Sequence, residues 1–258
     1  MRFALFRRAA PDPAHLDIRH EGDSFQVILR RRATARRMTL RVSSATRAVV
    51  LTVPEHADLA AASRFADGHG AWIAARLARV PERVAFLHGA EIPFRGVPHR
   101  IVRWSSVRGA TVATHGPANE PIIAVSGEAP HVARRVRDFL EREARRELVA
   151  AVKPYTEALG LDAKRITVRD TKSRWGSCSA SGCLNFSWRL ILAPPFVLDY
   201  LAIHEVAHLV EMNHSPRFWR LVHRMCPDAE RAKAWLDAHG TDLHRYGLSG
   251  EGADSRAL

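Results

Sequence analysis

The sequence predicts an α+β fold in which a strand-rich amino-terminal part precedes a mostly helical carboxyl-terminal part. Short segments of alternating apolar and polar residues, separated by Gly and Pro, dominate residues 38–125. From residue 131 an amphipathic pattern of helical period runs to about residue 159, and an apolar segment of helical length covers 195–212. The composition, 47% hydrophobic and 26% charged over 258 residues, is that of an ordinary globular chain.

The first of these alternating segments predict a hairpin. Apolar and polar residues alternate over 38–42 and again over 49–53, on either side of a turn at 43–47. A helical stretch over 57–78, broken around 68–70, should follow. Further short strands are expected at 92–94, 99–104, 111–114 and 122–125. Together these strands predict an antiparallel, partly closed sheet.

A change of composition over 117–130 predicts a boundary between two domains. The expected domains are a strand-rich domain over 1–125 with a helical insertion, and a second domain over 130–250. The elements expected in the second domain are the amphipathic helix 131–159, strands over 165–170 and 183–192, the apolar helix 195–212 and a final helical stretch over 216–239.

The net charge of +12 arises from 39 Lys and Arg against 27 Asp and Glu. Of the 39 cations 35 are Arg, which in an Ala-rich chain is typical of GC-rich coding rather than of a phosphate-binding surface. Residues 1–50 carry +7 of this charge, and six Arg lie between Arg30 and Arg41. We interpret this run as a solvated basic face, with an anionic partner such as nucleic acid as the weakly supported alternative.

Cysteine usage and the start of the chain indicate a cytoplasmic protein. Three cysteines are an odd number and too few for a disulfide framework, and Cys178 and Cys183 are expected as free thiols beside a hairpin turn. No apolar segment follows Arg7 and Arg8, as a secretory signal would require. No apolar stretch approaches the roughly 18 to 20 residues of a membrane-spanning helix, so no membrane partner is expected.

The motif His204-Glu205-Val206-Ala207-His208 lies in the apolar segment 195–212. Two His four residues apart share one face of a helix, so both imidazoles can bind one cation. Zinc suits neutral imidazole ligands, and a catalytic zinc site keeps one position open for water. Glu205 would reach that water rather than the metal and act as general base. Burying two His and a Glu without a metal or partners would be costly, which favours one Zn²⁺ per chain.

His214 is the predicted third ligand. It lies six residues beyond His208, which is the ligand spacing of the metzincins, although Glu211 stands where that motif has Gly. Asn213 tolerates the left-handed conformation that would let the chain leave the helix and return His214 to the site. Glu211, one turn after His208, and Glu230, on the downstream helix, stay open as alternative ligands.

The sequence resembles the YgjP-like metallopeptidase family, which is related to the SprT-like and WLM zinc proteases, in the stretches Ser173–Ser179, Asn185–Leu190, Leu198–Tyr200, His204–His208, Asn213–Pro216 and Phe218–Trp219. The match is specific over about residues 164–236 and looser before them. The resemblance implies a zincin-like metallopeptidase domain with zinc on His204, His208 and His214 and with Glu205 as catalytic base. At least one member of the family is described as a nucleoside-triphosphate pyrophosphatase, so the resemblance indicates the site better than the substrate.

Residues before the motif are candidates for binding substrate. A strand that precedes the active-site helix should form the sheet edge beside the cleft, where an extended peptide can pair. Arg174 can stabilise an oxyanion or hold a substrate carboxylate or phosphate, and Tyr200 is a second oxyanion candidate. Trp175 and Trp188 can wall a subsite. The alternative is that both Trp pack in the core and that Arg174 is a surface or ion-paired residue.

We therefore predict a zinc-dependent hydrolase, first of all a metallopeptidase acting on peptide or protein substrates. The alternative with the same metal is a nucleoside-triphosphate pyrophosphatase, although no G-x-x-x-x-G-K-[ST] phosphate loop occurs in the chain. A non-enzymatic alternative is a DNA-associated zinc protein whose basic amino-terminal half binds nucleic acid.

Overall fold

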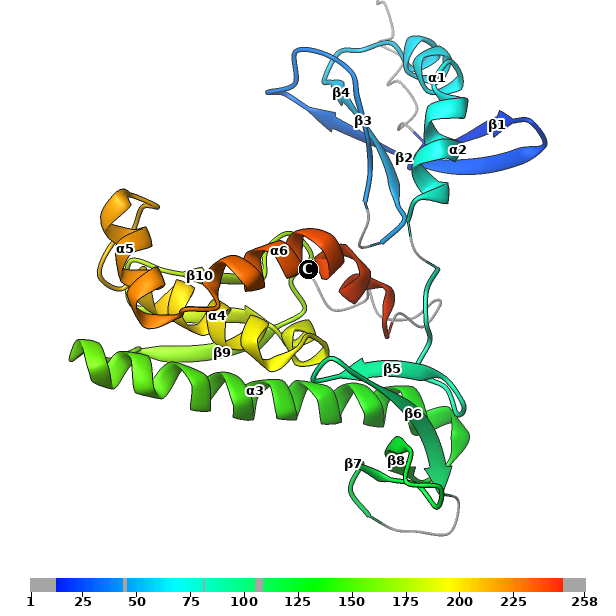
Figure 1. The fold of residues 1–258 in the computed structure, drawn as a ribbon. Coiled ribbons are helices and arrows are strands. Elements are labelled where there is room, and N and C mark those ends of the chain that lie inside the picture. Colours follow the sequence, from blue (N-terminus) through cyan, green and yellow to red (C-terminus); the bar gives the residue numbers. More distant parts are fainter. Residues whose placement is uncertain (1–12, 44–45, 81, 105–108, 248–258) are drawn as a thin grey trace, which may run out of the picture. The chain divides into compact units, whose positions relative to one another are not determined.

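The computed structural model describes residues 13–43, 46–80, 82–104 and 109–247 (Figure 1). Contacts divide the chain into two compact units, Met1–Pro81 and Glu82–Leu258. The start of the chain, interpreted above as lacking a secretory signal, and part of the turn at 43–47 lie outside the described residues. Among the described residues, no helix has both the length and the apolar character needed to span a bilayer.

The first unit is a four-stranded sheet with two helices packed on it. Its elements are β1 (His15–His20), β2 (Asp23–Arg32), β3 (Thr39–Val42), β4 (Val49–Pro54), α1 (Leu59–Asp67) and α2 (Gly70–Ala78). The strand order is β1-β2-β4-β3. Ile18 and Leu51 of the sheet share a buried cluster with Ala66 of α1 and Ile73 of α2. The predicted hairpin is confirmed as the antiparallel pair β3–β4, and the predicted helix as α1 and α2.

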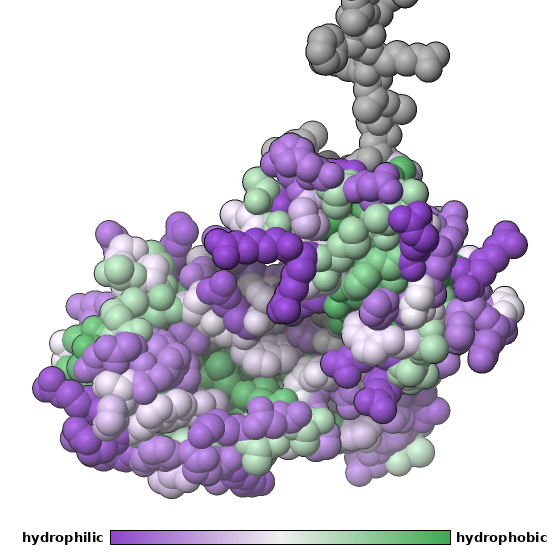
Figure 2. All heavy atoms as spheres, turned by 90° about the horizontal axis from the view of Figure 1, so that it is seen from above, coloured by the Kyte–Doolittle hydropathy of each residue, from purple (hydrophilic) through white to green (hydrophobic). Residues whose placement is uncertain are grey.

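Most of the basic run around β2 is solvated, as expected, because Arg30, Arg32 and the Arg residues up to Arg41 are exposed. Arg31 is the exception. Its guanidinium donates to the backbone oxygens of Glu55 and Ala57 at 2.8 and 2.7 Å, which ties β2 to the connection between β4 and α1. Hydrophilic side chains are also prominent on the face drawn in Figure 2.

The second unit holds the remaining elements around one large apolar core. They are β5 (Glu91–Phe94), β6 (Val97–Trp104), β7 (Val112–His115), β8 (Pro121–Ser126), η1 (Ala129–His131), α3 (Val132–Leu159), β9 (Arg165–Arg169), β10 (Gly176–Cys178), β11 (Cys183–Ser187), η2 (Trp188–Leu192), α4 (Pro195–Ala207), α5 (Pro216–Met225), α6 (Ala229–His239) and η3 (Gly240–Arg245), where η marks 3-10 helices. The prediction of a mixed α+β fold is therefore confirmed.

The strands do not form the antiparallel sheet predicted from the sequence. The second unit has a four-stranded sheet, β5-β6-β8-β7, and a separate three-stranded sheet, β10-β11-β9. β6 pairs with β8 in parallel, as β2 does with β4 in the first unit. β7 comes between β6 and β8 in the sequence, but in the sheet it lies at the edge, beyond β8. β3 lies beyond β4 in the same way. This placement of the edge strands makes the two central strands of each sheet parallel.

The division between the units differs from the boundary predicted over 117–130. The strands of the sheet β5-β6-β8-β7 belong with the second unit because they share its core. Ile101 of β6 and Ile123 of β8 lie in one buried cluster with Val136 and Phe139 of α3. Alternating apolar residues show that a strand has a buried face, but they do not show which element covers that face.

Helix α4, which carries the motif, is buried on nearly all sides. It packs against α3, α5, α6 and strand β10. Pro194 and Pro195 begin it, because proline suits the first helical position. The helix is shorter than the predicted 195–212, since it ends at Ala207 and the amide of Glu211 closes the last turn on the Ala207 carbonyl.

Two further elements differ from the prediction in the same way. The helical stretch over 216–239 is two helices, α5 and α6, separated at 226–228. The strand expected over 183–192 ends at Ser187 and continues as the 3-10 helix η2. The amphipathic helix from residue 131 is confirmed as α3, and Gly160 ends it in the left-handed conformation with a φ of 63°.

Candidate metal centre

Three histidines from two neighbouring segments meet at the end of α4. His204 lies in its last turn, His208 is its C-cap residue, and His214 lies in the loop before α5. Each offers one ring nitrogen, and the three nitrogens lie within 4.8 Å of one another. The Nε2 atoms of His204 and His214 are 3.2 Å apart. Two nitrogens bound to one tetrahedral zinc ion would lie about 3.3 Å apart, so the cluster fits such an ion.

The other ring nitrogens of the two helix histidines are held by protein groups. Nδ1 of His204 lies 3.3 Å from the Tyr200 hydroxyl, and Nδ1 of His208 lies 3.1 Å from the Glu211 carbonyl. Because the carbonyl can only accept, it selects the His208 tautomer that carries a proton on Nδ1 and leaves Nε2 free to bind a cation. Such partners fix the ring orientation of metal-binding histidines.

Phe218, the third residue of α5, supports all three imidazoles. Its ring is fully buried, and its centroid lies 5.0, 4.6 and 4.8 Å from those of His204, His208 and His214. Trp219 stacks on His214 at 5.8 Å. Phe218 and Trp219 were noted above only among the residues that resemble the family, and their role in supporting the imidazoles was not predicted. Their position at the start of a helix, four and five residues after His214, was the signal for this role.

The loop that returns His214 to the site does not use the predicted conformation. The backbone of Asn213 is not left-handed. Instead, its side-chain oxygen accepts a hydrogen bond from the Ser215 amide at 3.0 Å, and the Ser215 hydroxyl accepts one from the Phe218 amide at 3.3 Å. Asn213 therefore shapes the turn through its side chain, and Ser215 caps α5.

Burial keeps the helix histidines neutral. Burial first, and then the neighbouring His208 and His214, together lower the pKa of His204 to about 4. Burial also lowers the pKa of His208. Neutral imidazole is the form that binds a metal, so the triad is ready for a cation at neutral pH.

Glu205 lies beside the triad with only 3% of its surface exposed. Its Oε2 atom is buried and, among the described residues, has no hydrogen-bond partner. Burial raises the pKa of Glu205 to about 8, and the positive charge of Arg174 opposes this shift. A buried carboxyl group with an unsatisfied oxygen is costly unless a ligand or water completes it, which marks Glu205 as a functional group.

Gly176, the first residue of β10, makes the room for Glu205. A β-carbon at this position would lie 2.7 Å from both Cγ and Cδ of Glu205 and closer still to Oε1. Such contacts are too short for a side chain, so Glu205 would have to move. This role was not predicted, because a glycine in a strand indicates that a neighbour approaches closely without indicating which neighbour.

Changing Gly176→Ala should therefore lower turnover without removing the metal. A displacement of about 1 Å at a reacting group can reduce the rate about 100-fold, and we expect a loss of about 10- to 100-fold in kcat. Metal content and kcat are measured on the same preparation. Gly68→Ala is the control, because its β-carbon has no neighbour closer than 3.4 Å and it should leave both values unchanged. Full activity of Gly176→Ala would show that Glu205 needs no fixed position.

The cleft extends to both sides of His204 and Glu205. One part, of about 560 Å³, is lined by the triad, Arg174, Met212 and residues of β10. The other part, of about 320 Å³, lies between Trp175, Tyr200 and α6. Gly176, His204 and Glu205 line both parts. A substrate can therefore extend past the site in two directions.

The profile described as "YgjP-like, metallopeptidase domain" matches residues 36–239, which is most of the chain. The chain belongs to the YgjP-like metallopeptidase family. Among curated proteins, none matches the sequence. Among solved structures, the crystal structure of the metallopeptidase zymogen of Pyrococcus abyssi abylysin is similar, with 27% identity, coverage of 39% of this chain and 99% of that chain, and a TM-score of 0.33. The resemblance seen in the sequence is thus confirmed.

The three residues considered as the third ligand of this YgjP-like metallopeptidase lie in different places in the structure. His214 joins the cluster, whereas Glu211 faces it only through its carbonyl. Glu230 forms an ion pair with Lys233, lies 3.5 Å from Nε2 of His223 and contributes no atom to the cluster. Of the three candidates for a third ligand, only His214 lies within reach of the two helix histidines.

The candidate substrate-binding residues also differ in position, because some line the cleft and one lies in the core. Arg174 lines the cleft beside Glu205. Trp175 lines the second part of the cleft and stacks on His244 at 4.9 Å. Trp188 is 1% exposed and packs in the core, so it cannot wall a subsite of the YgjP-like domain. Tyr200 lines the second part of the cleft, with its hydroxyl beside His204.

The Trp175 partner His244 makes stability depend on pH. Burial, together with the charge of Arg189, lowers the pKa of His244 to about 4. In the unfolded chain the pKa of His244 is near 6.5, so below this pH the unfolded chain binds a proton that the folded protein does not bind. The free energy of unfolding therefore falls as the pH drops from about 6.5 towards 4. Between pH 7 and 4.5 this group alone should cost about 2 kcal/mol.

The measurement is urea unfolding of the metal-free protein at pH 7 and 4.5, for the natural sequence and for His244→Phe. The variant keeps an aromatic ring against Trp175 but cannot be protonated. It should lose about 2 kcal/mol less stability on acidification than the natural protein. An identical loss in both proteins would rule out His244 as a source of the pH dependence.

Proposed function

We propose that this protein is a zinc-dependent metallopeptidase whose second unit is a zincin-like catalytic domain. His204, His208 and His214 would hold one Zn²⁺. The observation that carries the proposal is the convergence of these imidazoles beside a buried carboxyl group with an unpaired oxygen, in a cleft. When bound, the ion would polarise a substrate carbonyl, lower the pKa of water and favour the ionised form of Glu205.

We infer that Glu205 moves the protons of the reaction. As a carboxylate it takes a proton from the attacking water and then delivers that proton to the departing amine. A pKa raised by burial suits this second step, because a more basic carboxylate holds the proton until the amine accepts it. Gly176 leaves the space that Glu205 occupies during both steps.

The substrate class follows from strand β10. It pairs with β11 on one side and forms the edge of its sheet, and its residues line the cleft. An extended peptide can bind such an edge through backbone hydrogen bonds, which fits peptide substrates of varied sequence. The Arg174 side chain lines the same cleft and has no hydrogen-bond or ion-pair partner among the described residues, so it is free to bind a substrate carbonyl or carboxylate.

The test is cleavage of an unfolded protein such as casein by the purified enzyme. Hydrolysis should stop when a zinc chelator is added and return when Zn²⁺ is restored. Pyrophosphate release from nucleoside triphosphates is measured on the same preparation and should be absent. A fully zinc-loaded protein that cleaves no peptide but releases pyrophosphate, with that release lost in Glu205→Gln, would replace the peptidase proposal with the nucleotide one.

A further inference from the structure

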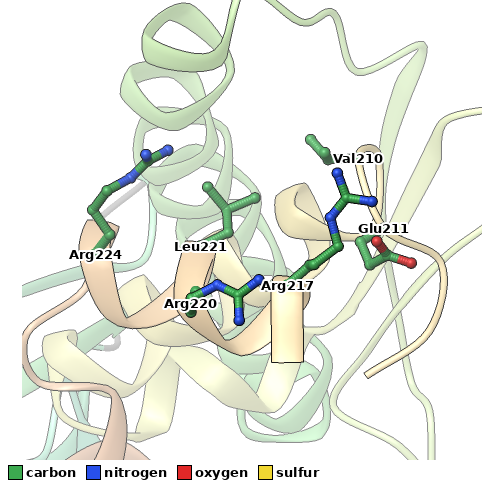
Figure 3. A pocket seen from close by; sticks show the side chains of 6 residues that line it. All are labelled: Val210, Glu211, Arg217, Arg220, Leu221 and Arg224. Carbon is green, nitrogen blue, oxygen red and sulfur yellow. The ribbon is translucent and has the colours of Figure 1, made fainter. Parts of the chain in front are cut away.

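A second depression lies next to the metal centre on α5 (Figure 3). Its volume is about 650 Å³. The residues that line it, here called the α5 arginine groove, are Val210, Glu211, Arg217, Arg220, Leu221 and Arg224. No step of the proposed peptide hydrolysis uses this groove.

The groove concentrates positive charge that is only partly neutralised. Arg217, Arg220 and Arg224 follow one another at intervals of three and four residues, so they lie along one face of α5, as Figure 3 shows. All three are exposed, and none has a hydrogen-bond or ion-pair partner among the described residues. Glu211 is the single carboxylate among the lining residues, which leaves the groove with a net charge of +2.

The groove and the cleft share one short segment of chain. Residues 209–213 join His208 to His214, the two proposed ligands on either side of this loop. Val210 and Glu211 line the groove, whereas Met212 and His214 line the cleft. A peptide that leaves the cleft over Met212, which is 54% exposed, therefore meets the groove within a few residues.

We propose that the α5 arginine groove binds an acidic segment of the polypeptide substrate, an inference that rests on the proposed peptidase function. Arginine presents a planar fork of donors that matches a carboxylate. The apolar side chains of Val210 and Leu221 add surface for the uncharged residues between the acidic ones. A peptide is favoured over nucleic acid because no aromatic side chain lines the groove for a base to stack on.

The test uses Glu205→Gln protein, which binds substrate without cleaving it, and two fluorescent peptides of about 12 residues. The peptides are identical except that four Glu of one are Gln in the other. At low salt the Glu peptide should bind about 10-fold more tightly, since each exposed Arg–carboxylate contact contributes a factor of about two. Adding Arg217→Gln, Arg220→Gln and Arg224→Gln together should reduce this preference to less than about twofold.

The control removes three other exposed cations, which lie on α3, by Arg134→Gln, Arg145→Gln and Lys153→Gln. It lowers the net charge by the same amount and should keep the preference. Arg220→Gln alone should give an intermediate value, which separates loss of the groove from misfolding of the triple variant.

Three results would overturn the proposal. They are equal affinity of the starting protein for the two peptides, an unchanged preference in the α5 triple variant, and duplex DNA that binds through the three Arg while the acidic peptide does not. The binding readout needs no turnover. If the preference for the Glu peptide depends on the groove but the natural enzyme cleaves neither peptide, binding of acidic peptides by the groove is supported and the peptidase function is contradicted.

Discussion

Changing Glu205→Gln should abolish most of the turnover and leave the metal in place. The amide has the size of the carboxylate, but it cannot take a proton from water. General base catalysis of this kind contributes a factor of about 10² to 10⁴, and we expect kcat to fall by that amount with little change in KM. The substitution breaks no hydrogen bond of Oε2, because this atom has no partner among the described residues.

The comparison needs both kinetics and metal analysis. The metal content of Glu205→Gln should equal that of the natural protein. Glu230→Gln is the control, because Glu230 is exposed and ion-paired with Lys233 outside the cluster and should be dispensable. Loss of metal in Glu205→Gln would make this residue a ligand, and retention of full activity would remove it from the mechanism.

Changing His208→Ala should remove the metal altogether. Two imidazoles remain, one of them on an exposed loop, and a site with two ligands holds zinc far less tightly than one with three. We expect the metal content after dialysis to fall from about one ion per chain to below about a tenth. In the natural protein, zinc at 1,000 times its Kd should stabilise the fold by about 4 kcal/mol, and in the variant this gain should vanish.

The matched control for this prediction is His223→Ala. His223 lies on α5, one turn beyond Trp219, and pairs with Glu230 rather than joining the triad. Its removal should change neither the metal content nor the rise in melting temperature on addition of zinc. If His208→Ala keeps a full complement of metal, the ion is bound elsewhere and the site is wrong.

The convergence of the three histidines could be predicted because its determinants are local in sequence. A spacing of four residues fixes the relative positions of His204 and His208 as soon as the segment is helical. A loop of five residues made it possible to predict that His214 returns to His204 and His208. It did not show how the loop turns. Asn213 and Ser215 form that turn through their side chains, an alternative that was open to both residue types.

The surroundings of the site could not be predicted, because they depend on contacts between segments distant in sequence. Gly176 lies almost thirty residues before the carboxyl group that it accommodates. Trp188 is close in sequence to Trp175, but it packs in the core while Trp175 lines the cleft. Nothing in the residue types distinguishes the two tryptophans.

The pairing of the amino-terminal strands could not be predicted from the sequence for a different reason. The hairpin of β1 and β2 was not predicted, because the arginines at the end of β2 were interpreted only as charge. The signal was the turn at Glu21 and Gly22, both with positive φ, between two segments that each place one apolar residue in the core. Parallel pairing of β2 with β4 was not predictable either, since it depends on where β3 lies.

X-ray absorption at the zinc edge tests the central claim most directly, because it counts the atoms around the ion in the natural protein. Three imidazole nitrogens and one oxygen at about 2.0 to 2.1 Å are expected in the natural protein, and His214→Ala should lose most of the bound zinc. Cys178 also lines the cleft. A sulfur neighbour at about 2.3 Å, or an unchanged zinc content in His214→Ala, would contradict the triad.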